Sequence, residues 1–192
     1  MIHPALLAAG AAATLFTLYF FRDPEREITA TPGQIVSPAD GRVLSIDEVE
    51  NESFPGGRCK RISIFLSVFN VHINRAPVGG KVETVRYKPG KFAIASTDAA
   101  SRNNESNTID INGETIKIIV KQIAGTVARR IICYCNPGQT LRTGERIGMI
   151  RFGSRTELYV PLDCEIFLSV GQKVKGGLSL VGTYNGAFEK KT

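Results

Sequence analysis

Residues Thr108–Val120 read TIDINGETIKIIV, and this stretch decides the fold class. Isoleucine, valine and threonine dominate both of its halves, and Asn112-Gly113 divides them. An Asn-Gly pair between two such runs is the strongest short-range signal for a β-hairpin. The stretch therefore predicts two paired antiparallel strands.

The same pattern continues on both sides of this hairpin. From Gln34 onward, short runs rich in β-branched residues alternate with turn residues, and no later window has apolar residues at helical spacing. Further strands are predicted at Ile35-Val36, Gly41–Ile46, Arg61–Val68, Lys81–Tyr87, Arg130–Tyr134, Arg146–Phe152, Glu157–Val160, Ile166–Val170 and Leu178–Val181. The polar stretch Pro89–Asn107 is predicted to be a long functional loop. We expect a mainly β fold, a compact β-sandwich or barrel-like domain of the hybrid-motif type, behind an N-terminal hydrophobic helix.

The N-terminal segment Pro4–Phe21 reads PALLAAGAAATLFTLYFF and contains no charged residue. Its length is at the short end of what spans a hydrocarbon core of about 30 Å. Because no basic residue precedes it, we favour an uncleaved membrane anchor, spanning or interfacial, over a signal peptide. A buried core helix is the remaining alternative. Residues 1–27 form the anchor and linker, and residues 28–192 the globular domain. Arg22 and Arg26 follow the anchor, so the positive-inside rule places the domain on the cytoplasmic side of the cell membrane.

Composition narrows the classes of partner. The 192 residues include 24 Lys and Arg against 18 Asp and Glu, a formal net charge of +6. A basic balance indicates an anionic partner. The chain has no Trp and no basic-aromatic run, which leaves a membrane surface or an acidic substrate ahead of nucleic acid. Four cysteines are too few for a disulfide scaffold, and the C-x-C spacing of Cys133 and Cys135 does not match a zinc site, so no metal is predicted.

Two residues are candidates for proton transfer. His72 is the one histidine of the globular domain, and imidazole titrates near neutral pH, so it is the candidate general base. Asp40 lies in the turn Ser37–Gly41, bracketed by Pro and Gly, and is the candidate carboxylate that orients His72. The structural alternatives are a buried core histidine and an Asx turn.

A third element is Phe152-Gly153-Ser154-Arg155, in a strand-like run. Gly153 in such a run indicates a close backbone approach, with a β-bulge as the alternative. Ser154 beside it is the candidate nucleophile. The set Asp, His and Ser is also that of a serine hydrolase, but no Gly-x-Ser-x-Gly motif surrounds Ser154. Arg75 and Arg155 are candidates for binding an anionic substrate.

Taken together, these residues resemble the short form of the phosphatidylserine decarboxylases, over nearly the whole chain. The markers follow one another in order: Phe21–Pro24, Ser37–Gly41, Asn70–Pro77, Asn104–Asn107, Gln122–Gly125, Ala128–Arg130 and Gly148–Tyr159. The resemblance implies a membrane-associated proenzyme that converts a serine phospholipid, diacyl or archaeal ether, to the ethanolamine phospholipid.

The resemblance also implies roles for individual residues. Cleavage at Gly153–Ser154 would give a β chain of residues 1–153 and an α chain of residues 154–192, with Ser154 converted to a covalent pyruvoyl group. Asp40 and His72 match the acidic residue and the histidine of the family's self-cleavage triad. Where longer members carry a second histidine, this chain has Arg75.

The chemistry of decarboxylation agrees with that expectation. Loss of carbon dioxide leaves an electron pair on the α-carbon, and a ketone that forms a Schiff base with the substrate amine accepts it. No Gly-rich phosphate loop suited to pyridoxal phosphate follows a strand. A membrane-tethered lipoyl-like carrier or binding module and a serine hydrolase are the alternatives, and a homo-oligomer remains open.

Overall fold

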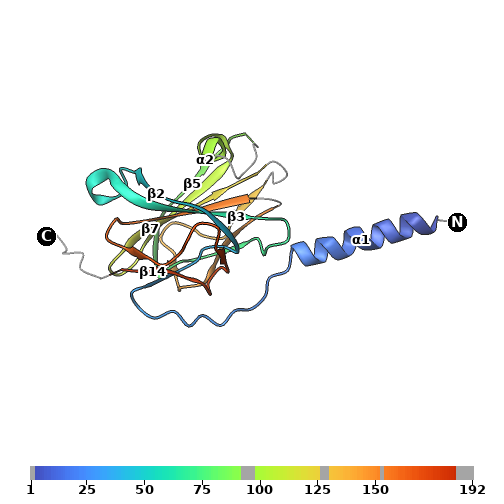
Figure 1. Cartoon of the computed structure of the whole chain (residues 1–192), viewed down its shortest axis with the longest axis horizontal. Coiled ribbons are helices and arrows are strands. Elements are labelled where there is room, and N and C mark those ends of the chain that lie inside the picture. Colours follow the sequence, from blue (N-terminus) through green and yellow to red (C-terminus); the bar gives the residue numbers. More distant parts are fainter. Residues whose placement is uncertain (1–2, 92–97, 126–129, 152–153, 185–192) are drawn as a thin grey trace.

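The structure, a computed structural model, describes residues 3–91, 98–125, 130–151 and 154–184. It is mainly β, as the sequence predicts (Figure 1). The helical elements are α1 (Pro4–Phe20), a 3-10 turn (Pro55–Gly57) and α2 (Asp98–Asn103). The strands are β1 (Gln34–Val36), β2 (Gly41–Glu50), β3 (Arg58–Leu66), β4 (Ile73–Arg75), β5 (Gly80–Lys88), β6 (Ser106–Asn112), β7 (Lys117–Ile123), β8 (Ile131–Cys133), β9 (Thr140–Leu141), β10 (Arg146–Ile150), β11 (Ser154–Val160), β12 (Glu165–Ile166), β13 (Lys173–Val174) and β14 (Leu180–Thr183).

One large curled sheet dominates the domain. Its strand order is β13-β2-β3-β11-β7-β6-β5-β9, and every recorded pairing is antiparallel. Two smaller sheets, β1-β14-β12 and β4-β10-β8, complete the barrel-like body. The hairpin predicted from Asn112-Gly113 is confirmed, because β6 and β7 pair in continuous register from Ser106↔Ile123 to Asn112↔Lys117.

Two sequence expectations need correction. The stretch Pro89–Asn107 is not a continuous loop, because it contains α2 and the first residues of β6. Ala99, Ala100 and Arg102 have high helix propensity, which accounts for this short helix. The strand predicted at Arg146–Phe152 ends at Ile150, and β11 begins at Ser154. Phe152 and Gly153 lie outside the described residues.

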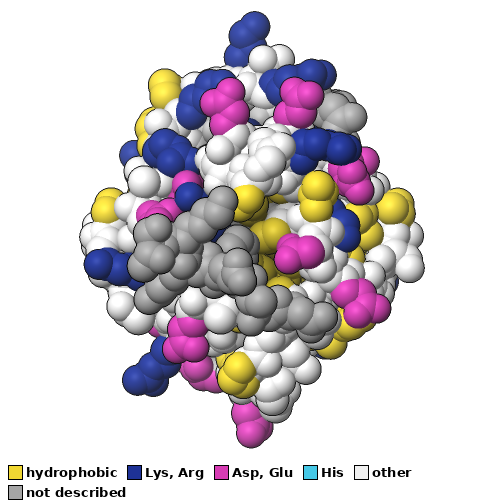
Figure 2. All heavy atoms as spheres, turned by 90° about the vertical axis from the view of Figure 1, so that its left-hand side faces the viewer, with side chains coloured by type: hydrophobic (Ala, Val, Ile, Leu, Met, Phe, Trp, Pro, Cys, Tyr) yellow, Lys and Arg dark blue, Asp and Glu magenta, His cyan; other side chains and the backbone are white. Residues whose placement is uncertain are grey.

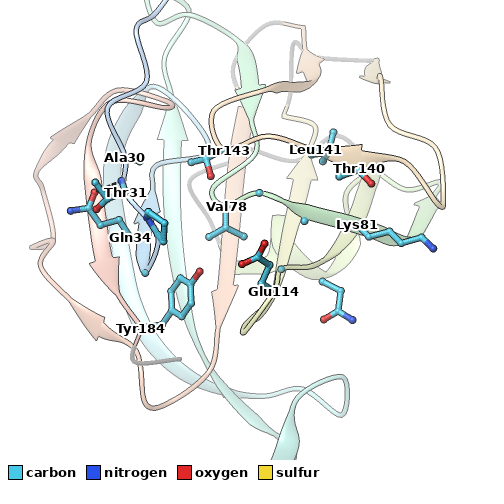
Figure 3. Close-up of a pocket in the computed structure, with 16 residues that line it drawn as sticks. Ala30, Thr31, Gln34, Val78, Lys81, Glu114, Thr140, Leu141, Thr143 and Tyr184 are labelled. Carbon is cyan, nitrogen blue, oxygen red and sulfur yellow. Dashed lines mark hydrogen bonds between the residues drawn. The ribbon is translucent and has the colours of Figure 1, made fainter. Parts of the chain in front are cut away.

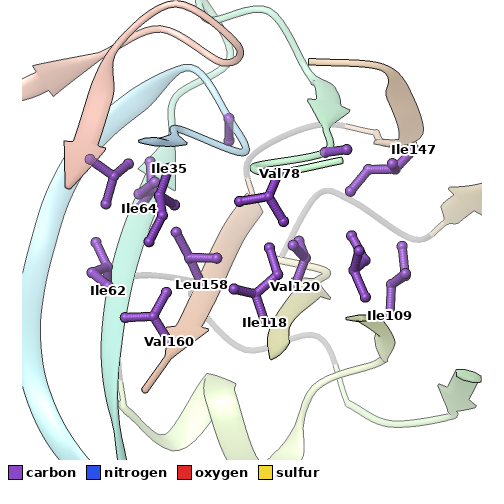
Figure 4. Packing of buried hydrophobic residues seen from close by; sticks show 14 of the residues in the cluster. Ile35, Ile62, Ile64, Val78, Ile109, Ile118, Val120, Ile147, Leu158 and Val160 are labelled. Carbon is purple, nitrogen blue, oxygen red and sulfur yellow. The ribbon is translucent and has the colours of Figure 1, made fainter. Parts of the chain in front are cut away.

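Branched aliphatic side chains fill the space between the sheets (Figure 4). Ile62 and Ile64 of β3 lie beside Leu158 and Val160 of β11 in this core. Side chains alternate between the two faces of a strand, so Ser154 and Thr156 share the inner face with Leu158 and Val160. The first residue of β11 therefore directs its hydroxyl toward the interior.

Helix α1 extends away from the β body (Figure 1). His3 caps its N-terminus by accepting a hydrogen bond from the backbone N–H of Ala5 at 3.3 Å. Phe20 is its one buried residue, whereas leucines along its length are exposed, Leu15 and Leu18 by 67% each. None of the helices in the described part of the chain combines the length and apolar character needed to cross a membrane.

Candidate functional site

Ser154 lies at the start of β11, opposite Leu66 of β3. Its side chain is fully buried, and its Oγ has no hydrogen-bond partner among the described residues. A buried hydroxyl without a partner is costly, typically by about 1–3 kcal/mol. Such a group is a candidate for reaction rather than for structural support.

His72 approaches the same segment from the other side. Its backbone carbonyl accepts a hydrogen bond from the N–H of Ile150 at 3.2 Å, four positions before Ser154 along the chain. Its Nδ1 lies 3.0 Å from the carbonyl oxygen of Asn70. Because a carbonyl can only accept, Nδ1 carries the proton and Nε2 is left as an unprotonated acceptor. Nε2 is also buried without a hydrogen-bond partner in the described residues.

Burial keeps His72 neutral. Desolvation, with a smaller contribution from the charge of Arg22, lowers the pKa of its imidazole to about 4. The carbonyl of Asn70 and the charge of Asp40 oppose this shift. A ring contact with Phe20 supplies part of the cover, with centroids 4.3 Å apart. The structure thus holds a neutral imidazole, the form that can take a proton from a hydroxyl.

Asp40 is buried, but its carboxylate faces an arginine. Arg26 binds it through both guanidinium nitrogens, Nη1 to Oδ1 at 2.6 Å and Nη2 to Oδ2 at 2.9 Å. The backbone N–H of Gly176 donates to Oδ1 at 2.8 Å. The carbonyl of Asn70, and not Asp40, is therefore the group that fixes the His72 tautomer here. Asp40 acts on His72 through its charge alone in this arrangement.

A buried polar chain supports the inner face of β11. Asn74 of β4 donates from Nδ2 to Thr156 Oγ1 at 3.0 Å, and its Oδ1 accepts from Gln122 Nε2 at 2.9 Å. Gln122 Oε1 in turn accepts from Asn107 Nδ2 at 3.1 Å. All four side chains are buried. Asn74 and Gln122 each hydrogen-bond to a neighbour on both sides, so this series of hydrogen bonds holds Thr156 in place. Ser154 lies two residues before Thr156 on the same face of β11, so its position is fixed as well.

Arg75 does not point into open space. Its guanidinium donates to the carbonyl oxygens of Gly144 at 3.0 Å and Pro24 at 3.1 Å, and it pairs with Asp23 at 3.5 Å. These contacts fix the linker after α1 to the domain. Burial, together with the nearby cations Arg146 and Arg26, lowers the pKa of Arg75.

Arg155 is buried on the outer face of β11. Its Nη2 lies 2.9 Å from Glu157 Oε1 and donates to Ser63 Oγ at 2.7 Å. Alternation along the strand places Arg155 on the face opposite Ser154. The structure thus brings Ser154, His72 and Asp40 to one region, and it gives both predicted headgroup arginines a carboxylate partner within the protein.

One cavity is separate from these residues. It has a volume of about 530 Å³, and its lining includes Gln34, Val78, Glu114 and Tyr184 (Figure 3). Ser154, His72 and Asp40 do not contribute to its walls. The cavity therefore adds nothing to the candidate site.

Sequence reasoning did not identify Phe20, Asn70, Asn74 or Gln122 as site residues. Asn70, Asn74 and Gln122 lie in the marker stretches Asn70–Pro77 and Gln122–Gly125 that carry the family resemblance, and this was the available signal. In the sequence, Arg26 reads only as a charge that flanks the anchor. Nothing local in the sequence indicates its contact with Asp40.

Fold and site together define a mainly β protein whose central sheet buries a serine and a neutral histidine at one end. A family model described as phosphatidylserine decarboxylase matches residues 13–182. The chain belongs to this family, and it is a decarboxylase, a carboxy-lyase.

Individual relatives agree with the family model. The phosphatidylserine decarboxylase proenzyme of Syntrophus aciditrophicus is 48% identical over 90% of this chain and 81% of the relative. The proenzyme of Desulfotalea psychrophila is 46% identical over 88% of this chain and 80% of the relative. The proenzyme of Symbiobacterium thermophilum is 45% identical over 94% of this chain and 85% of the relative. This membership favours the decarboxylase over the carrier and hydrolase alternatives.

Proposed function

We propose that this protein decarboxylates phosphatidylserine to the ethanolamine phospholipid, using a pyruvoyl group that it makes from its own Ser154. The observation that carries this proposal is the pair of buried atoms without partners, Ser154 Oγ and His72 Nε2, at the same end of the central sheet. The Ser154 hydroxyl is a hydrogen-bond donor and the neutral His72 Nε2 is an acceptor, so the serine can give its proton to the histidine.

Self-cleavage starts at the bond between Gly153 and Ser154. His72 Nε2 takes the hydroxyl proton, and Ser154 Oγ attacks the carbonyl carbon of Gly153. The new C–O bond replaces the C–N bond, and the released nitrogen takes up the proton, which leaves an ester. Loss of the α-proton of residue 154 then expels the carboxylate of Gly153. Hydrolysis of the resulting imine releases ammonia and leaves a ketone as the first group of the α chain.

The ketone supplies an electrophilic carbonyl that takes up the substrate amine and accepts the electron pair released with carbon dioxide. The residues present fit this group, because the position of Ser154 is enclosed and its oxygen has no other bond to keep. His72, whose backbone carbonyl accepts from the N–H of Ile150 four residues before Ser154, is the base that would take and return the proton. Asp40 and Arg26 form a bidentate ion pair, which adds a fixed dipole to the wall of the site.

The location that we propose for this protein is the cell membrane, with the globular domain on its cytoplasmic side. Helix α1 presents uncharged, largely apolar side chains to its surroundings, and its last turn packs on His72. We place α1 at the membrane interface or deeper, with residues 1–27 as anchor and linker. The partners are then the anionic serine phospholipid, the membrane, and the α and β chains of one precursor.

Trapping tests the proposed function. Mature protein is incubated with phosphatidylserine and cyanoborohydride, and the masses of both chains are measured. A substrate adduct on residue 154 of the chain 154–192, with loss of turnover, is expected. A lysophospholipid without the serine amine is the control and should give no adduct. An adduct mapped to a lysine, such as Lys91 or Lys121, or activity that needs added pyridoxal phosphate, would contradict the mechanism.

A further inference from the structure

The headgroup of an anionic phospholipid needs cationic residues near the site, and the two arginines expected from the sequence are occupied. Arg75 holds the linker, and Arg155 pairs with Glu157 on the outer face of β11. Other cations at this end of the sheet are therefore left to bind the phosphate.

A cavity of about 710 Å³ opens beside the site. Asp40 and Asn70, which act on His72 through charge and through a hydrogen bond, form part of its wall. The cations that line it are Arg22, Arg42, Lys173 and Lys175, and Phe65 and Phe69 add apolar surface. Arg42, Lys173 and Lys175 are all exposed. A pocket with several cations and an apolar wall suits a molecule with an anionic head and a hydrocarbon tail.

Strand register relates this cavity to Ser154. Lys173 pairs with Arg42, and Arg42 pairs with Phe65, at the end of β3 where Leu66 faces Ser154. Strands β2 and β11 flank β3, so they are two inter-strand spacings apart, or about 10 Å. Because Phe65 also pairs with Arg155, Lys173, Arg42 and Phe65 share the outer face of the sheet with Arg155, whereas Ser154 is on the inner face. The cavity is therefore connected to the site around the end of the sheet, where Asp40 and Asn70 form part of its wall.

The end of α1 fixes one wall of the cavity. Arg22 Nη2 donates to the carbonyl oxygen of Phe69 at 2.7 Å, and Tyr19 Oη donates to the same oxygen at 3.2 Å. The Phe69 ring remains 65% exposed. The cationic pocket therefore opens beside the C-terminal end of α1. If the apolar side chains of α1 lie in a membrane, the pocket is at the depth of the lipid headgroups. By contrast, Figure 2 shows a face on the far side from α1, where cationic and acidic side chains are mixed.

We propose that Arg42, Lys173 and Lys175 form the subsite that binds the headgroup of an anionic membrane phospholipid, with the Phe69 ring beside its acyl chains. This inference rests on the proposed function for the identity of the substrate. The subsite itself is defined by charge and position, so it binds an anionic phospholipid whether or not that lipid carries serine. Each cation near an anionic surface adds to binding, so loss of two should weaken it about ten- to thirty-fold.

The test uses a Lys173→Gln/Lys175→Gln variant and a matched control, Lys81→Gln/Arg142→Gln, which removes two exposed charges outside this pocket. Both are made in full-length protein that also carries Ser154→Ala, so the result does not depend on cleavage or turnover. Sedimentation with phosphatidylglycerol vesicles and with neutral phosphatidylcholine vesicles measures binding. The first variant should bind phosphatidylglycerol about ten- to thirty-fold more weakly, and the control less than three-fold. Binding to phosphatidylcholine should be equal for both.

A second measurement uses the cleavable protein. The Lys173→Gln/Lys175→Gln enzyme should mature fully, and its KM for phosphatidylserine in mixed micelles should rise about ten-fold with kcat within two-fold of the parent. Equal losses of vesicle binding in the variant and its control would overturn the subsite, as would unchanged binding in both. If the vesicle result holds but no pyruvoyl chain forms in the parent, the proposed function fails and the subsite stands.

Discussion

The contact between Phe20 and His72 makes a strong prediction about pH. Phe20 is fully buried, and its ring lies 4.3 Å from the imidazole, so Phe20→Ala admits water to His72. The charged groups that act on the imidazole, Arg22 and Asp40, are unchanged in this variant. We therefore expect the pKa of His72 to rise from about 4 toward its ordinary value of 6.5.

The size of the effect follows from these two values. At pH 5.5 a pKa of about 4 leaves about 97% of the imidazole neutral, whereas a pKa of 6.5 leaves about 9%. Self-cleavage of Phe20→Ala at pH 5.5 should therefore slow by up to about ten-fold relative to pH 7.5. The parent should show almost no difference between the two pH values.

The assay is cell-free translation of labelled protein, diluted into buffers at pH 5.5 and 7.5 and sampled by denaturing electrophoresis. Phe20→Leu keeps an apolar cover and should retain the pH profile of the parent. Phe20→Ala costs up to about 3–5 kcal/mol of packing, so its folding is checked by thermal unfolding in the Ser154→Ala background. A folded Phe20→Ala protein with the same rate ratio as the parent would refute the reasoning.

Three further predictions follow from the site. Ser154→Ala should remain a single chain without activity by denaturing electrophoresis, because no hydroxyl is left to attack Gly153. Asp40→Asn should slow self-cleavage by about 10²–10⁴, since the charge that supports protonated His72 is lost, and maturation at the parent rate would remove Asp40 from the triad. The folded pKa of His72 is below its unfolded value of 6.5, so the unfolded state binds more protons below pH 6.5. Stability to urea should thus fall as the pH drops from 6.5 through 4, by up to about 3 kcal/mol, and this loss should be absent when His72→Gln is added to Ser154→Ala.

Local patterns made the strands of the sheet predictable. The Asn112-Gly113 turn and the β-branched runs beside it fold as expected, because both the turn and the side-chain spacing act over a few residues. Strand β4 was not predicted. Its residues Ile73–Arg75 form a strand only because β10, far along the chain, pairs with them.

The environment of the site depends on contacts that no local pattern shows. Asp40 receives a guanidinium from Arg26 and a backbone N–H from Gly176, at sequence separations of 14 and 136 residues. Arg155 reads as an exposed cation in the sequence, yet Glu157 two positions on shares its face of β11 and pairs with it. Motif order predicts which residues carry the chemistry, whereas the contacts around those residues could be seen only in the fold.

The central claim is that Ser154 becomes the ketone of a two-chain enzyme, and intact-mass measurement of the purified, active protein tests it most directly. The account predicts a chain of residues 1–153 and a chain of residues 154–192 that is lighter by one ammonia than the same chain with an N-terminal serine. It also predicts that the smaller chain resists N-terminal sequencing, since a ketone replaces its amine. A single full-length chain in an active preparation, or a small chain that begins with an intact serine, would contradict the account.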